Sequence, residues 1–254
     1  MEYFWYQQDD IPSDMGYPLF GKEHIISTCV TLAAVVLLAV LFRRAEDKIQ
    51  RRVLKGIPVL MILLEVWKDL FLVSMQKFGV GYLPLHICSI GIFVFLLREL
   101  LPSDAWKAFF GEVSVILIMP SALTALIFPD WTVLYPMLNF FNLHSFLWHG
   151  LLVLYPVLLL ICGEVRPSLK HIWYEILFLC VVVPPIYVFD KHFHCNYFFV
   201  NRPEPGTPLE WMAGFLGNPG YLIAYAFLAI AVMLLVYGVL YLVMRFRKDS
   251  GRPE

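Results

Sequence analysis

Apolar stretches long enough to cross a membrane alternate with short charged segments along the whole chain. A hydrocarbon core of about 30 Å takes about 20 helical residues per crossing. Seven segments reach that length: residues 24–42, 57–76, 83–101, 105–128, 137–163, 171–189 and 220–244. The pattern predicts an all-α polytopic membrane protein, a seven-transmembrane-helix bundle that forms one domain over residues 1–254. Six full crossings with one re-entrant segment remain the alternative.

The composition points to the same class of protein. The chain has 254 residues, of which 60% are hydrophobic and 15% charged, and its mean hydropathy is +0.72. These values exclude an ordinary soluble domain. We expect a multi-pass protein of the cell membrane whose partners are membrane phospholipids and not nucleic acid. The five cysteines include no CxxC pair, so they form neither a disulfide framework nor a zinc-finger pattern, and we expect no metal and no cofactor.

Lysines and arginines are concentrated in the loops on one side of the predicted spans. Residues 43–55 hold six lysines and arginines, and a loop at the membrane surface explains this run better than nucleic-acid binding does. With the N-terminus outside, 14 lysines and arginines lie on the inner side and 4 on the outer side, with Lys68 inside a span. The positive-inside rule therefore predicts an external N-terminus and a cytoplasmic C-terminus.

The segment Leu83–Ser89, Leu-Pro-Leu-His-Ile-Cys-Ser, places an imidazole and a thiol at the outer mouth of the third span. Pro84 has a fixed φ and no N–H to lose, so it suits the first turn of a helix. Cys88 would then lie near the helix N-terminus, where free N–H groups and the macrodipole stabilise a thiolate. Cys88 is the candidate nucleophile and His86 a candidate for substrate binding. A buried cysteine that only packs is the alternative.

A stripe of polar residues follows the span 137–163. At 100° per residue, Asn142, Ser145 and His149 fall within about 60° of one another. His144 lies about 140° from His149, so the two histidines do not form the metal-binding pair of an HExxH motif. We predict that His149 is a general base and that Asn142 and His144 contact substrate. A histidine that serves only packing is again the alternative.

Three charged residues interrupt the span 57–76. Glu65, Lys68 and Asp69 share one helix face through their i,i+3 and i,i+4 spacing, and charges at such depth point into the bundle. One interpretation is an internal ion pair that fixes helix packing. The functional interpretation makes Asp69 the carboxylate that orients a catalytic histidine.

The only long loop, residues 190–219, is predicted to be external. It follows Pro184-Pro185, which should kink or stop the sixth helix. Loops of this length are usually functional or disordered. Asn196, Tyr197 and Arg202 are candidates for binding the substrate, through its carbonyl oxygen or its phosphate.

Several segments together resemble a known family. They are Leu-Pro-Leu-His-Ile-Cys-Ser at 83–89, Phe-Leu-Trp-His-Gly at 146–150, and a loop run of Asn196-Tyr197, Arg202-Pro203 and Pro219-Gly220-Tyr221. These motifs resemble the YwaF-type bacterial integral membrane family. That family is similar to a eukaryotic transmembrane family of ether-phospholipid acyltransferases that is thought to use an intramembrane cysteine and histidine. The resemblance implies those roles for Cys88 and His149.

Two functions of different classes follow. In the first, the protein is a phospholipid acyltransferase or acyl hydrolase, with Cys88 attacking an ester near the outer leaflet and His149 as base. In the second, it is a seven-helix transporter or receptor for a proton or small ligand, with no covalent chemistry. The sequence shows no internal repeat of the kind that transporter folds often contain, which counts against the second function.

Overall fold

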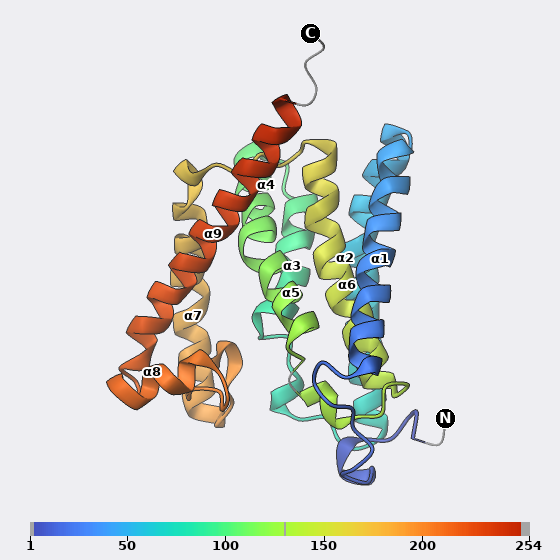
Figure 1. Ribbon diagram of the computed structural model, residues 1–254, viewed down its shortest axis with the longest axis vertical. Helices are drawn as coiled ribbons and strands as arrows, with labels where there is room; N and C mark the ends of the chain where they lie inside the picture. Colours follow the sequence, from blue (N-terminus) through green and yellow to red (C-terminus); the bar gives the residue numbers. More distant parts are fainter. Residues whose placement is uncertain (1–2, 130, 250–254) are drawn as a thin grey trace.

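The structure, a computed structural model, describes residues 3–129 and 131–249, and within them every regular element is helical. The longer helices run between the two ends of one bundle, as Figure 1 shows. The nine α-helices of the described residues are α1 (Lys22–Arg44), α2 (Asp47–Ser74), α3 (Ile87–Leu100), α4 (Asp104–Val113), α5 (Met119–Ile127), α6 (Phe140–Cys162), α7 (Trp173–Phe193), α8 (Pro208–Leu216) and α9 (Tyr221–Asp249). The all-α prediction is confirmed.

Five helical stretches in the described residues are long and apolar enough to cross a membrane. Four of them correspond to α1, α6, α7 and α9. The fifth contains both α4 and α5. The helix α2 falls outside this set because charged residues interrupt its apolar run. The helix α3 has 14 residues, about 21 Å at 1.5 Å per residue, which is short of a 30 Å core. The seven-span count and the orientation therefore stay predictions.

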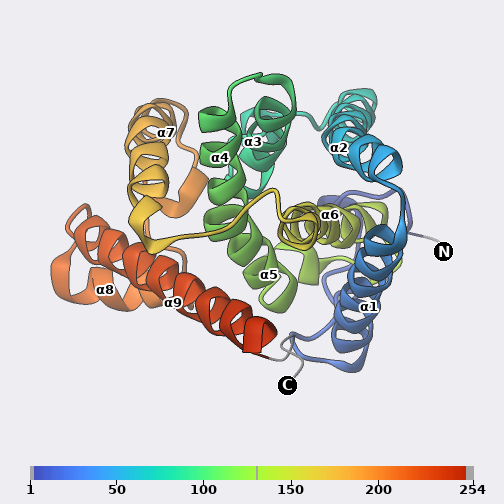
Figure 2. The same cartoon turned by 90° about the horizontal axis from the view of Figure 1, so that it is seen from above.

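The helix α6 occupies the middle of the bundle, between α1 and α3 (Figure 2). Most of it is buried, whereas α1, α7 and α9 bury only small parts of their apolar stretches. Large aliphatic side chains such as Val36, Val181 and Ile223 are exposed on these outer helices. An apolar exterior of this kind suits lipid as the surrounding solvent, because only there does exposed apolar surface carry no hydration cost.

The two ends of the bundle differ in composition. The N-terminal end is covered by residues 3–21, whose backbone carbonyls at Tyr3 and Tyr6 accept hydrogen bonds from Asn139 Nδ2 at 2.8 and 3.0 Å. The basic end carries the turn from α1 to α2, with Arg43 and Arg44 at the end of α1. The chain starts at the first end, and α9 leaves at the second (Figure 1).

The prediction that Pro84 lies in the first turn of a helix is wrong, and of the two outcomes predicted for Pro184-Pro185, a kink or a stop, the stop is excluded. Pro84 lies before its helix, because Leu85 N donates to Leu83 O at 2.8 Å in a tight turn and His86 is extended, so α3 begins only at Ile87. Pro184-Pro185 does not stop α7, which continues to Phe193. A helix in a membrane tolerates proline when its neighbours satisfy the freed backbone groups. As a result, the predicted loop 190–219 contains the last turn of α7 and all of α8.

Candidate functional site

Cys88 and His149 lie at the same level on two packed, parallel helices. Gly91 of α3 is so close to α6 that a Cβ there would lie 2.7 Å from Leu152 Cδ2. One turn further along, the Phe95 and Tyr155 rings stack with their centroids 4.1 Å apart. Because these contacts advance together along both helices, α3 and α6 run in the same direction. Cys88 precedes Gly91 by three residues, and His149 precedes Leu152 by three. The same register therefore places Cys88 and His149 side by side, one turn before the contact between Gly91 and Leu152.

The two side chains approach the interface from different angles. Cys88, Gly91 and Phe95 share one face of α3 through their i,i+3 and i,i+4 spacing. On α6, His149 lies about 60° to one side of Leu152 and Tyr155 about 60° to the other, so His149 is at the edge of the surface that faces α3. Across the described residues, no hydrogen bond joins the Cys88 thiol to the imidazole.

Ser145 holds the imidazole of His149. His149 Nδ1 lies 2.8 Å from the backbone carbonyl oxygen of Ser145 and 3.2 Å from its Oγ. A carbonyl oxygen can only accept, so Nδ1 carries the proton and donates it. Nε2 of the neutral ring then keeps its lone pair. The arrangement presents Nε2 as the atom that can take a proton.

Asp69 has a different partner from the one predicted. Lys68 Nζ lies 2.7 Å from Glu65 Oε1 and 3.4 Å from Asp69 Oδ1. The structure therefore shows the ion pair that the spacing predicts, extended to a second carboxylate. None of the described histidines forms a hydrogen bond with Asp69. The role assigned to Asp69, to orient an imidazole, is filled by Ser145 for His149.

The other two predicted histidines lie on either side of this pair. His86 is the N-cap residue of α3, and its ring packs against Tyr197 and Phe199 at centroid distances of 4.8 and 5.8 Å. His144 stacks on Trp148 at 5.5 Å. Its Nε2 is buried without a hydrogen-bond partner in the described residues. An unpaired buried nitrogen is costly, so this atom is a polar group able to take a ligand.

The loop after α7 covers the start of α3. The Tyr197 hydroxyl donates to the Val80 carbonyl at 2.6 Å, and the Tyr221 hydroxyl donates to the Phe199 carbonyl at 2.7 Å. Asn196 Oδ1 accepts from the backbone N–H of Arg202 at 3.0 Å. Burial raises the pKa of the Tyr197 hydroxyl above its usual range, so it remains a donor. Of the three loop candidates, Asn196 and Tyr197 hold the loop in place, and Arg202 is exposed.

Asn142 also has a structural partner. The Tyr17 hydroxyl donates to Asn142 Oδ1 at 3.1 Å, and Asn142 Nδ2 donates to the Met137 carbonyl at 3.1 Å. Both contacts fasten the N-terminal end of the bundle around the start of α6. Asn142 thus shares a stripe with His149 but joins a different network.

The sequence pointed to Glu112 as a buried charge for packing or gating, but Asp190 and the contacts of Tyr237 were not predicted. Asp190, near the end of α7, is fully buried, and neither of its carboxylate oxygens has a hydrogen-bond partner in the described residues. At the basic end, the Tyr237 hydroxyl lies between Glu112 Oε2 and Glu175 Oε2, at 3.0 and 3.1 Å. For Tyr237 the available signal was the carboxylates of Glu112 and Glu175 inside apolar runs, whereas Asp190 stands at the end of its run beside Lys191. No three His, Cys, Asp or Glu side chains in the described ranges form a group that could hold a metal ion.

The comparisons with known proteins identify a family. A family model described as the TMEM164 family matches residues 19–237, which include every site residue named above. The chain belongs to this family, and it is a membrane protein. Among curated proteins and among solved structures, nothing matches it.

Proposed function

We propose that this member of the TMEM164 family is a phospholipid acyltransferase or acyl hydrolase of the cell membrane, with Cys88 as nucleophile and His149 as base. The observation that carries the proposal is the register of α3 against α6, which aligns the two residues one turn before the contact between Gly91 and Leu152 along both helices. The resemblance of the segments at 83–89 and 146–150 to the YwaF-type family, and through it to ether-phospholipid acyltransferases, supports the same pair.

The chemistry uses one proton carrier twice. His149 Nε2 takes the thiol proton, and the Cys88 thiolate attacks the ester carbonyl of a phospholipid to give a tetrahedral intermediate. The ester C–O bond breaks, the lysophospholipid oxygen receives the proton from Nε2, and the acyl chain remains on Cys88 as a thioester. An acceptor hydroxyl or water then gives its proton to Nε2 and attacks the thioester carbonyl. The C–S bond breaks, and the departing Cys88 sulfur takes the proton from Nε2, which restores the thiol.

The start of α3 supplies donors for the developing negative charge. Cys88 is the second residue of the helix, and the first four N–H groups of an α-helix have no partner within it. Such groups stabilise an oxyanion when they point at the carbonyl oxygen. The exposed guanidinium of Arg202, in the loop that covers this helix start, is the group we assign to the lipid phosphate.

Acyl transfer predicts a thioester on one cysteine. The folded protein in nanodiscs is incubated with a phospholipid that carries a labelled acyl chain, and the modified cysteine is located by mass spectrometry and tested for release by hydroxylamine. We expect the label on Cys88, none in Cys88→Ala, and a large loss in His149→Ala, because residues that act as one unit lose most of the effect with either removal.

Two matched controls make this test specific. Cys162 lies in α6 and is also partly buried, so Cys162→Ala should leave labelling unchanged. His144 lies on another face of the helix that carries His149, so His144→Ala should reduce labelling far less than His149→Ala. Equal labelling of Cys88 and Cys162, or labelling of Cys88 that does not depend on His149, would rule out the catalytic pair.

A transporter or receptor for a proton or small ligand is the second candidate. The observation that favours it is the group of charged and polar residues in the N-terminal half of the bundle: half-buried Lys68 with its two carboxylates, and the buried, unpaired Nε2 of His144. Proton uptake by vesicles that contain the protein, abolished by Lys68→Met and unaffected by Cys88→Ala, would favour this function over acyl transfer.

A further inference from the structure

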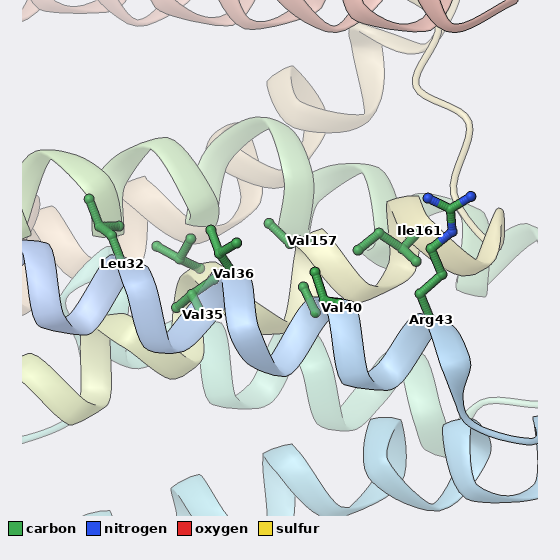
Figure 3. A pocket seen from close by; sticks show the side chains of 9 residues that line it. Leu32, Val35, Val36, Val40, Arg43, Val157 and Ile161 are labelled. Carbon is green, nitrogen blue, oxygen red and sulfur yellow. The ribbon is translucent and has the colours of Figure 1, made fainter.

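A groove lined almost entirely by aliphatic side chains runs along the outside of the bundle between α1 and α6. It encloses about 530 Å³, and its walls include Val36 and Val40 of α1 and Val157 and Ile161 of α6. Figure 3 shows these side chains along the groove and Arg43 standing at its end beside Ile161. The groove therefore combines an apolar channel with one cation at the basic end.

The length of the groove matches one leaflet of a bilayer. Its lining on α1 begins at Leu32 and ends at Arg43. Eleven helical steps of 1.5 Å give about 16 Å. This is close to half of a hydrocarbon core about 30 Å thick. An acyl chain from the leaflet at the basic end would fill the groove with its ester end next to Arg43.

The charge at the end of the groove favours an anion. Arg43 is exposed, and among the described residues it takes part in no ion pair. A second hollow of about 450 Å³ close by in sequence is lined by four more cations, at Lys48, Arg51, Arg52 and Lys55. Basic side chains at a membrane surface attract anionic lipids with about 1 kcal/mol each.

We propose that the groove between α1 and α6 holds one acyl chain of an anionic phospholipid from the leaflet at the basic end, with Arg43 paired to its phosphate. A helix from a second copy of the chain would also cover the aliphatic walls, and the second pair of variants below separates that occupant from the lipid. The site lies toward the opposite end of the bundle from Cys88, so it does not depend on the proposed acyl transfer.

Native mass spectrometry of the full-length protein in detergent tests this site. The probes are phosphatidylglycerol and phosphatidylcholine with identical acyl chains, added over a range of concentrations. We expect one phosphatidylglycerol to bind in preference to phosphatidylcholine, and Arg43→Gln to weaken its binding about fivefold, the loss expected for one cation. The control is Arg44→Gln, which removes the neighbouring charge from a residue that does not line the groove.

A second pair of variants tests the apolar walls. Val36→Trp fills the groove and should reduce the binding of both lipids, whereas Val181→Trp adds the same bulk at an equally exposed position on α7 and should not. Equal losses in Arg43→Gln and Arg44→Gln would overturn the proposal in favour of a diffuse surface charge. Phosphatidylglycerol binding that survives Val36→Trp would overturn it too, as would a dimer of the chain that Val36→Trp dissociates.

Discussion

The close approach of α3 to α6 depends on Gly91. A Cβ at this position would lie 2.7 Å from Leu152 Cδ2 and 3.0 Å from Ile118 Cγ2. Both neighbours are fully buried, so neither can move away into solvent or lipid. We predict that Gly91→Ala pushes the two helices apart, although alanine is the better helix former by about 1 kcal/mol.

The expected size of the effect is set by two opposing terms. Overpacking of a buried contact costs about 1–3 kcal/mol, and the helix propensity of alanine offsets up to about 1 kcal/mol of it. With the full offset, the net destabilisation is up to about 2 kcal/mol. Each kcal/mol lowers Tm by about 2–4 °C in a chain of this size. Labelling of Cys88 by an acyl donor should slow as well, because the contact that sets its register with His149 is displaced.

Thermal unfolding of purified variants in nanodiscs measures this prediction. Gly238→Ala in α9 is the matched control, because a Cβ there meets nothing within 4 Å, and it should be neutral or stabilising. In a Leu152→Ala background, Gly91→Ala should destabilise much less, since the nearer of the two clashing methyl groups is gone and only Ile118 Cγ2 at 3.0 Å remains. If Gly91→Ala behaves like Gly238→Ala in the wild-type background, the proposed register of α3 and α6 is wrong.

Three further predictions concern other parts of the molecule. Tyr237→Phe should lower thermal stability by about 1–3 kcal/mol, because it leaves Glu112 and Glu175 without their shared donor; an unchanged Tm would contradict that contact. Tyr197→Phe should expose the loop after α7 to limited proteolysis. Since burial raises the pKa of the Tyr197 hydroxyl above the usual 10.0, wild-type stability should fall as pH rises above about 10, where the unfolded chain releases this proton first, and the variant should lose that component of the fall. A reporter after the last helix should be cytoplasmic and a tag at the N-terminus external, and the reverse result would refute the charge argument.

Local spacing predicted some of the site correctly. The i,i+3 spacing of Glu65 and Lys68 is sufficient to predict their ion pair, because both residues lie on one helix and no other element has to be placed. The same logic could have identified Ser145 as the partner of His149, four residues earlier on the same face. The sequence leaves open whether Asp69 orients a histidine or only pairs with Lys68, and the backbone carbonyl of Ser145 that holds His149 leaves no mark in the sequence.

Contacts between distant elements could not be predicted in this way. The Tyr197 hydroxyl donates to a carbonyl 117 residues away, and Tyr17 and Asn142 are separated by 125 residues. The type of side chain shows that Asn and Tyr can form hydrogen bonds. It does not show whether the partner is a ligand or another part of the protein. For this reason Asn142, Asn196 and Tyr197 were predicted to bind substrate, whereas in the structure their polar atoms fasten loops and helix ends.

The partners of the buried polar groups separate structural roles from chemical ones. In a membrane, an intramolecular hydrogen bond satisfies a polar atom that would otherwise be costly, so Tyr237 and Asn142 are explained fully by the helices they join. His149 differs, because its one strong contact fixes Nδ1 within its own helix and joins no second element. That contact orients Nε2 without tying helices together. A base requires this arrangement, since the ring must be held while one nitrogen stays free for a proton. The contrast is the physical reason for proposing acyl-transfer chemistry between α3 and α6, with the networks at the two ends of the bundle as structural support.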